Sequence, residues 1–531
     1  MKKPVKKLVS LLLALSLLLG CASALAGDTY PAEKVSYNVW IRMRPMNGNA
    51  DDMEIFKLME EKTNVHLNFE QIPQADWEEK ILQNLNGGKD LPDAYYSGYS
   101  LNSTQLLFYA GQGLLLPLND LIEQYMPNFK AKLEAHPEVK AAITAPDGNI
   151  YSLPFCRFDG LTGQIPSNMF INKVWLDKLN LSVPTTVEEL ETVLTAFKEN
   201  DCNGDGNPND EIPMTFKFEG SQRDLGGLFG MFGYADNLYG GQHHFCVDDG
   251  KVIFTPATEG YRKGCAYLYE HFFSKGLIDL EGFTMDKATY NAQNQGELAN
   301  IGAYFSWNIF DLGQAHMDEY VPMAPLLGPD GTTSWGYVTS SGIETVGLVL
   351  TKDCKDPANL IKWADLTYDD FYGMQLEYGC IGTNLVELPE GDPSGYKYDY
   401  VREYPDGMTY DEFLFGNTYP DSCLALFRDF YDTVLPMPDS AKAKDKINNE
   451  MYLPVATTRY YPTLLFSAED NDRINEIAPD IIGKAEEMRA EWLARGGVDE
   501  QWDDYIATLN AMGLQEYIDI YQKTYDTAYG K

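Results

Sequence analysis

The chain has 531 residues, of which 44% are hydrophobic and 13% aromatic, and its formal net charge at pH 7 is −38. A hydrophobic core stops growing at about 250–300 residues, so we expect more than one core. The apolar and aromatic content excludes an intrinsically disordered chain. The acidity argues against a nucleic-acid-binding protein, because contacts with phosphate backbones require a basic surface.

The first 26 residues are organised as an export signal. Four lysines precede an apolar run over 8–19, which is too short to span a bilayer but suits the core of a signal peptide. The run ends in Leu-Leu-Gly-Cys21, which resembles the lipobox of bacterial lipoproteins, whose cysteine is lipidated. Ala24-Leu25-Ala26 offers a competing cleavage site. Both alternatives predict an extracellular protein, either anchored to the cell membrane through Cys21 or secreted after cleavage behind Ala26.

The cysteines that follow Cys21 are scattered and form no Cys-x-x-Cys pair. Their spacing therefore indicates neither a zinc site nor a redox centre, and it defines no disulfide framework. They are Cys156, Cys202, Cys246, Cys265, Cys354, Cys380 and Cys423.

After the export signal, strand and helix patterns alternate. Strands are predicted over 35–43, 65–72 and 91–96, with helices over 52–63 and 75–85 between them. This β-α-β-α-β order predicts an α/β fold with a parallel sheet and helices on both faces. Such sheets bind ligands beyond the carboxyl ends of their strands. Four side chains lie at or just past such ends: Arg42, Arg44, Tyr96 and Tyr99.

A second α/β segment begins after Pro154. Further strands are predicted over 169–171, 300–307 and 342–350, and helices over 175–179, 186–199, 260–275, 287–298 and 357–367. Residues 387–406 are rich in glycine, proline and tyrosine and show little periodicity. The chain ends in two long predicted helices, over 469–495 and 501–525, whose aromatic and aliphatic stripe is typical of core packing.

Residues 201–211, Asp-Cys-Asn-Gly-Asp-Gly-Asn-Pro-Asn-Asp-Glu, carry the most specific motif after the export signal. Calcium takes six to eight oxygen ligands, and alternating Asp and Asn on a tight loop can supply them. The first half matches the EF-hand pattern, with Gly206 at the turn, but the twelfth position is Ile212. We predict a structural Ca²⁺ site; the alternative is a turn whose side chains bond the local backbone. The predicted ligands are Asp201, Asn203, Asp205, Asn207 (through its carbonyl), Asp210 and Glu211.

The segments 169–179 and 183–190, followed by the loop 201–213, resemble family 1 extracellular solute-binding proteins. The resemblance is strongest to the long lipoprotein branch and to alginate-oligosaccharide-binding proteins, which carry a similar calcium loop. Similar stretches at 113–121, 147–154 and 502–521 extend it over nearly the whole mature chain.

This resemblance implies a two-lobe periplasmic-binding-protein-like fold of type II, similar to maltose-binding proteins. Two or three hinge crossings would join the lobes, and a ligand in the interlobe cleft would close them. Lobe 1 would hold residues 30–157 and 331–385, and lobe 2 residues 158–330 and 386–531, which include the calcium loop. The resemblance implies a monomer that captures a carbohydrate, in our expectation an oligosaccharide, for the permease subunits of an ABC transporter.

Sugar sites combine aromatic platforms with hydrogen-bonding groups, because sugars present apolar faces and hydroxyl rims. Trp307 ends a predicted strand at the place where maltose-binding-like proteins have a stacking aromatic residue. Arg42, Arg44 and Arg157 would clamp a carboxylate if the sugar is acidic; ion pairing is their alternative role. The other aromatic candidates, each with ordinary packing as its alternative, are Trp40, Tyr99, Trp335, Tyr337 and Tyr378.

Three other functions are alternatives. The bound solute could be a peptide or another small molecule in place of a sugar. An exported glycosidase or lyase would need a defined catalytic pair, and no Gly-x-Ser-x-Gly, His-Glu-x-x-His or phosphate-loop motif occurs in the chain. A surface receptor would use the same fold without import. We expect a binding protein and no enzyme.

Overall fold

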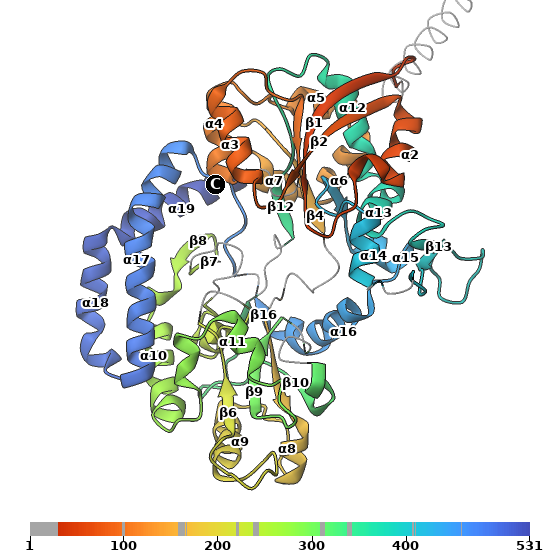
Figure 1. Ribbon diagram of the computed structural model, residues 1–531. Coiled ribbons are helices and arrows are strands. Elements are labelled where there is room, and N and C mark those ends of the chain that lie inside the picture. The colour runs from red at the N-terminus through yellow and green to blue at the C-terminus, as the bar shows by residue number, and fades with distance from the viewer. Residues whose placement is uncertain are drawn as a thin grey trace, which may run out of the picture. The chain divides into compact units, whose positions relative to one another are not determined.

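The computed structural model in Figure 1 describes most of the chain after residue 29. The described residues are 30–97, 101–157, 165, 167–218, 222–236, 244–307, 309, 314–336, 342–405, 408, 410–457 and 459–530. Cys21, Tyr99, Tyr337 and the predicted export signal lie outside them. Within these ranges, no helix combines the length and the apolarity that a membrane span requires.

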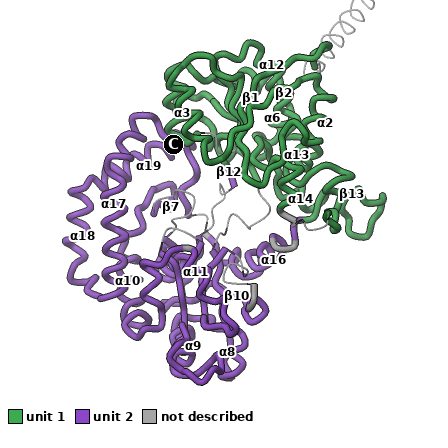
Figure 2. The backbone as a smooth tube through the Cα atoms, viewed as in Figure 1, with its two compact units in different colours: residues 1–157, 343–436 green, residues 158–342, 437–531 purple. Residues whose placement is uncertain are grey.

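The chain forms two compact units, each built from separate stretches of sequence (Figure 2). Unit 1 comprises Met1–Arg157 and Ile343–Pro436, and unit 2 comprises Phe158–Gly342 and Met437–Lys531. The chain therefore passes from one unit to the other three times.

Two of these crossings differ from the predicted lobe boundaries after residues 330 and 385. Residues 386–436 belong to unit 1, because β15 (Leu424–Leu426) pairs in parallel with β4 (Leu153–Arg157) in its sheet. Residues 331–342 belong to unit 2, where β11 (Trp335–Gly336) pairs with β16 (Ala456–Thr457). Both corrections rest on strands of two or three residues, which are too short to produce a periodic pattern.

Unit 1 is built on a six-stranded sheet with the order β15-β4-β12-β3-β1-β2. β1 (Val35–Met43) pairs in parallel with β2 (Val65–Pro73) and β3 (Ala94–Tyr96), as the predicted β-α-β-α-β order requires. β12 (Ile343–Leu350) is antiparallel to both of its neighbours. The helices of this unit are α2 (Glu54–Thr63), α3 (Trp77–Gly87), α4 (Ser103–Gly111), α5 (Asn119–Tyr125), α6 (Pro127–Ala135), α7 (Pro137–Ile143), α12 (Pro357–Asp365), α13 (Asp370–Tyr378), α14 (Tyr410–Asn417) and α15 (Arg428–Thr433). A small ladder pairs β13 (Leu385–Glu387) with β14 (Tyr398–Tyr400), and β14 lies within the stretch 387–406 that lacked periodicity.

Unit 2 contains a four-stranded sheet with the order β10-β5-β9-β6. Its strands are β5 (Asn168–Asn172), β6 (Ile212–Thr215), β9 (Ile301–Ser306) and β10 (Tyr320–Met323), and β7 (Phe245–Asp248) and β8 (Lys251–Phe254) form a separate hairpin. Its helices are α8 (Lys173–Lys178), α9 (Val187–Glu199), α10 (Glu259–Leu268), α11 (Lys287–Ala292), α16 (Asp439–Ile447), α17 (Ala468–Arg495), α18 (Val498–Met512) and α19 (Leu514–Tyr529).

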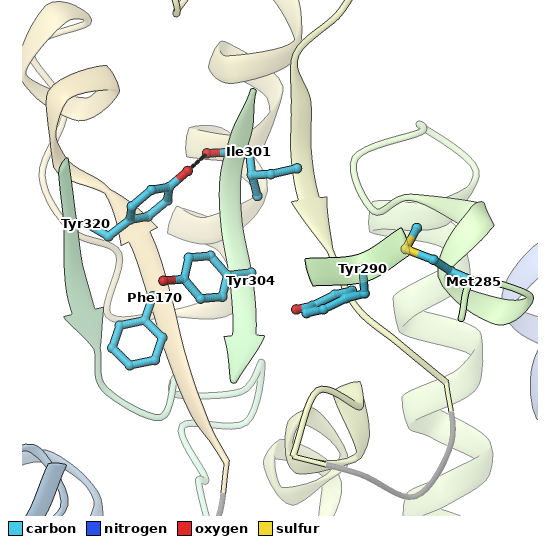
Figure 3. Packing of buried hydrophobic residues seen from close by; sticks show 6 residues of the cluster. All are labelled: Phe170, Met285, Tyr290, Ile301, Tyr304 and Tyr320. Atoms are coloured by element: carbon cyan, nitrogen blue, oxygen red, sulfur yellow. Dashed lines mark hydrogen bonds between the residues drawn. The ribbon is translucent and has the colours of Figure 1, made fainter. Parts of the chain in front are cut away.

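Aromatic residues fill one face of the unit 2 sheet (Figure 3). The Phe170 and Tyr304 rings stack with their centroids 5.3 Å apart. Buried tyrosine hydroxyls need partners, and backbone carbonyls of β9 supply them. Tyr320 donates to the carbonyl of Ile301, and Tyr290 donates to that of Phe305 over 2.7 Å. The core therefore fixes the strand that ends at Ser306.

The predicted helix over 501–525 is wrong: α18 and α19 meet at Gly513, whose φ of 104° ends the first helix. Only glycine adopts such an angle without strain, so Gly513 was a signal in the sequence for the end of a helix. The stripe itself packs in the core as predicted. Its buried members include Trp502, Tyr505, Leu509, Tyr517 and Tyr521.

A group of ionisable side chains lies inside unit 2, and we call it the Arg489 cluster: Asp224, Asp236, His244 and Arg489. The Arg489 side chain is 0% exposed; its Nη2 donates to Asp224 Oδ2 over 2.7 Å, and its Nη1 lies 3.5 Å from Asp236 Oδ2. His244 Nδ1 lies 2.8 Å from Asp236 Oδ1. Burial raises the pKa of Asp236, but His244 and Arg489 outweigh burial and hold the pKa below its usual range.

Candidate functional site

Charged side chains gather at the carboxyl ends of the parallel strands in unit 1, and we call Arg42, Arg44 and Asp421 the strand-end cluster. Arg42 Nη1 donates to Asp421 Oδ2 over 2.8 Å, and Arg44 Nε donates to the same oxygen over 3.0 Å. Arg44 Nη2 also pairs with Asp421 Oδ1. The Asp421 side chain is 3% exposed, against 12% for Arg42 and 31% for Arg44. Both arginines therefore already bind a carboxylate of their own chain.

Tyr419 holds the segment that carries Asp421 against these strand ends. Its hydroxyl is bonded to the carbonyl oxygens of Arg42, at 2.9 Å, and of Tyr96, at 3.0 Å. Tyr96 in turn bonds the hydroxyl of Ser422. Asp421 is thus fixed by its neighbours on both sides.

Glu344 is the second residue of β12 and lies opposite Phe155 of β4. The register between these two strands shifts between Glu344 and Leu348, which marks a β-bulge. Bulges are frequent beside binding sites, because they redirect side chains. The Glu344 side chain is half-buried, and burial, together with the negative charge of Asp421, raises its pKa to about 7.

The other unit 1 candidates divide between the surface and the interior. Arg157, whose side chain is 44% exposed, donates from Nη1 to the buried Glu377 over 2.7 Å. Trp40 is half-buried and meets Tyr95 edge-on at 5.7 Å. Tyr378 is 5% exposed and bonds the hydroxyl of Tyr431 over 2.8 Å, so it has the packing role named as its alternative.

Trp307 follows β9 in unit 2 and is half-buried. The ammonium group of Lys444 lies 4.2 Å from its ring centroid, a cation–π contact, and also donates to the Trp307 carbonyl. Asn168 Oδ1 accepts a further hydrogen bond from Lys444 over 3.2 Å. Lys444 therefore fixes the indole orientation, which suits Trp307 as a stacking platform.

Trp335 is 3% exposed and is packed inside unit 2. Its Nε1 donates to the carbonyl of Ser167 over 3.2 Å. Its ring lies so close to Gly227 that a Cβ there would stand 2.4 Å from a ring carbon. Stacking on a ligand would require the ring to leave this packing, so the structure gives Trp335 its alternative role.

The predicted calcium loop connects the end of α9 to the start of β6. Asp201 accepts backbone hydrogen bonds from Gly204 at 2.6 Å and from Gly206 at 3.0 Å. The φ angles of these two glycines, 87° and 94°, give the loop its tight turns. Asn203 and Asp205 each accept a bond from the backbone two residues on. Local bonds of this kind are what the Asx-turn alternative predicts.

Two carboxylate oxygen atoms of the loop take no part in these hydrogen bonds. Asp210 Oδ1 and Glu211 Oε2 are buried and have no hydrogen-bond partner among the described residues. Glu211 Oε1, by contrast, accepts the Cys202 N–H over 2.7 Å. Buried carboxylate oxygens without a donor are costly, and a bound cation would satisfy them. The donor set therefore fits calcium, although the described residues contain no group of three or more His, Cys, Asp or Glu side chains gathered as a metal site.

The sequence model of the family described as bacterial extracellular solute-binding protein matches residues 45–369. The fructooligosaccharide ABC transporter substrate-binding protein FusA of Streptococcus pneumoniae is 32% identical over 541 residues, covering 98% of this chain and 97% of FusA. This chain belongs to the family. The recognition made from the sequence is thereby confirmed.

Solved structures extend this likeness to the fold. FusA in complex with kestose gives a TM-score of 0.75 at 31% identity, covering 93% of this chain and 100% of that one. A second FusA structure is of an EF-hand mutant with fructo-nystose, also at a TM-score of 0.75. A human-milk-oligosaccharide (HMO)-binding solute-binding protein of Bifidobacterium longum infantis gives 0.80 at 24% identity, covering 94% and 99% of the two chains. The predicted two-lobe α/β fold is confirmed by these solute-binding proteins.

The sequence did not point to three of the residues that make these sites. Asp421 is one acid among many and lies 377 positions from Arg44. Lys444 lies on a helix that carries no motif, and Glu344 was only part of a predicted strand. These three residues share only their position in the folded chain. Each lies near the end of a strand that is distant from it in the sequence or is paired with such a strand, so no local pattern identifies it.

Proposed function

We propose that this extracellular solute-binding protein captures an oligosaccharide and presents it to the permease subunits of an ABC importer. One observation carries the proposal: FusA, named for fructooligosaccharides, matches 98% of this chain, and its kestose complex has the same fold. The ligand-contacting residues that we propose are Trp40, Arg42, Arg44, Tyr99, Arg157, Trp307 and Tyr337, whereas Trp335 and Tyr378 are assigned to packing because both are buried. Those with accessible rings or guanidinium groups, above all Trp307, are the first to test.

We further propose that the ligand is neutral. Arg42 and Arg44 bind Asp421, and Arg157 binds Glu377, so each candidate clamp already holds a carboxylate of the chain. A sugar carboxylate would have to displace a buried aspartate or glutamate whose charge would then lack a partner. A neutral sugar needs no such exchange.

Calorimetric titration of the mature chain from residue 27 onward tests both statements. Kestose, a galacturonate trisaccharide and a mixed tripeptide library serve as titrants. We expect saturable binding of kestose and none of the other two, with kestose recovered intact by chromatography. Binding of the peptides alone would overturn the carbohydrate assignment, preference for galacturonate would overturn neutrality, and hydrolysed kestose would indicate an enzyme.

We propose that a structural calcium ion occupies the loop over residues 201–211. Calcium would supply a divalent charge there, held by oxygen atoms of Asp201, Asn203, Asp205, Asn207, Asp210 and Glu211. The partnerless oxygens of Asp210 and Glu211 support this site. The ion would tie the end of α9 to β6 and has no part in ligand contact.

We propose that Cys21 anchors the protein to the outer face of the cell membrane as a lipoprotein. The support is the apolar run that ends in Leu-Leu-Gly-Cys21. Replacement of Cys21 by serine should release the protein into the medium, as judged by immunoblotting of cells and supernatant. Equal retention of the serine variant would instead favour a different anchor, and release of the wild type would favour cleavage behind Ala26.

A further inference from the structure

Glu344 differs from the other acidic side chains near the strand ends of unit 1. Asp421 and Glu377 are each 3% exposed, and each accepts a hydrogen bond from an arginine. Glu344 is half-buried and still reaches solvent, and none of the described residues gives its carboxyl group a hydrogen bond. Tyr96 ends β3 opposite Leu348, so Glu344 lies past the carboxyl end of β3, at the end of the sheet where α/β proteins bind their ligands.

We propose that Glu344 is a ligand-contacting residue that hydrogen-bonds a hydroxyl group of the neutral oligosaccharide in its protonated form. This inference rests on the proposed function. It assigns a role to a residue that the family resemblance did not single out. It also names the interaction, a hydrogen bond to a hydroxyl group, by which the site would recognise a sugar.

The surroundings of Glu344 favour the protonated acid. Asp421 carries the negative charge that Arg42 and Arg44 hold in place, and a second charge beside it is repelled. On β4, Cys156 is paired with Ile343, the residue before Glu344; burial raises the pKa of its thiol, and the charges of Glu138 and Glu344 raise it further. No guanidinium group of the described residues is bonded to Glu344.

A protonated carboxyl group suits a sugar hydroxyl well, because each can donate and accept one hydrogen bond. Binding of the sugar would remove the remaining water from Glu344 and raise its pKa above the value of about 7 in the unliganded protein. A group whose pKa is raised by binding takes up a proton. Affinity should therefore be full below pH 7 and fall as the pH rises through 7 towards 8.

The test is calorimetric titration of kestose into the mature chain at pH 6, 7 and 8, in buffers of different ionisation enthalpy. For the wild type we expect proton uptake at pH 7 and an affinity about five- to tenfold weaker at pH 8 than at pH 6. Glu344→Gln keeps the shape and both hydrogen-bonding roles without titrating. Its affinity should stay within about threefold of the wild type at pH 6 and should not change with pH. Glu344→Ala should bind about tenfold more weakly at pH 6, because the sugar hydroxyl loses its partner.

Glu134→Gln, at an exposed position of α6 in the same unit, is the matched control and should titrate like the wild type. Thermal melts establish that each variant is folded. If Glu344→Gln keeps the pH dependence of the wild type, or if Glu344→Ala binds as tightly, the proposal for Glu344 is wrong while the proposed function stands. If the wild type binds no oligosaccharide at any pH, both fall.

Discussion

The Arg489 cluster of unit 2 and the strand-end cluster of unit 1 both pair arginine with aspartate but differ in exposure. Arg489 and Asp236 are 0% exposed, and both are surrounded by protein. In the strand-end cluster only the carboxylate is buried, at 3% exposure, while Arg44 keeps 31%. Charges enclosed in a core can only stabilise the fold, whereas charges with an accessible edge can also contact a ligand. Exposure, and not residue type, separates the two roles.

The largest expected effect comes from breaking the Arg489 cluster. Arg489→Met leaves Asp224 and Asp236 buried without their guanidinium partner, so unfolding in urea should show a loss of about 3–5 kcal/mol. Arg495→Met is the matched control, because Arg495 is 76% exposed and pairs with Glu491 one turn away; it should cost at most about 0.5 kcal/mol. Similar losses of stability in the two variants would contradict a special structural role for the buried Arg489 cluster.

Removal of calcium should come next. Chelation with EDTA should lower the melting temperature by several degrees in calorimetry, because an ion at a hundred times its Kd stabilises a fold by about 2.7 kcal/mol. Glu211→Gln should abolish this shift, and Glu199→Gln, at the exposed end of α9, should keep it. Kestose binding should be unchanged once calcium is restored. An unchanged melting temperature would mean that the loop is only an Asx-rich turn.

Asp421→Asn should affect binding more than stability. It frees the charges of Arg42 and Arg44, so we expect about tenfold weaker binding of kestose and a new affinity for the galacturonate trisaccharide in calorimetric titration. The free energy of unfolding should fall by about 1 kcal/mol. Asp429→Asn, at an exposed position of α15, is the control. Unaltered selectivity would show that these arginines do not face the ligand.

The smallest effect is expected for Trp307, which tests whether exposure or membership of a unit decides the role of a residue. Trp307 lies in unit 2, like the Arg489 cluster, but it is half-buried. Trp307→Ala should weaken kestose binding about three- to tenfold, the worth of one stacking contact, with little change in stability. Phe371→Ala, an exposed aromatic residue of unit 1, should leave binding unchanged. A strong effect of Phe371→Ala alone would place the ligand elsewhere.

Local patterns were sufficient for the regular part of the fold. The strand predicted over 35–43 is β1, because the alternation of buried Tyr37, Val39 and Ile41 with less buried neighbours follows an apolar alternation that is visible in the sequence. The three residues of β15 are too few to show a period. The antiparallel direction of β12 depends on where the chain re-enters unit 1 after residue 342. Arg42 and Arg44 lie at the end of a strand, as predicted. Their partner Asp421 is brought to them by a segment far along the chain, and the spacing of residues in the sequence does not predict such a pairing.

The order of strands in unit 1 has a consequence for synthesis and export. β4 lies between β15 and β12, so both of its neighbours come from residues after 342. When residues 35–157 emerge from the export channel, β4 has no strand to pair with, and most of unit 2 must follow before β12 and β15 arrive. Pairing over such sequence separations is slow. The sheet of unit 1 therefore stays incomplete until residues 424–426 have emerged, and a chain arrested before that point would present the unpaired edges of β4 to other chains.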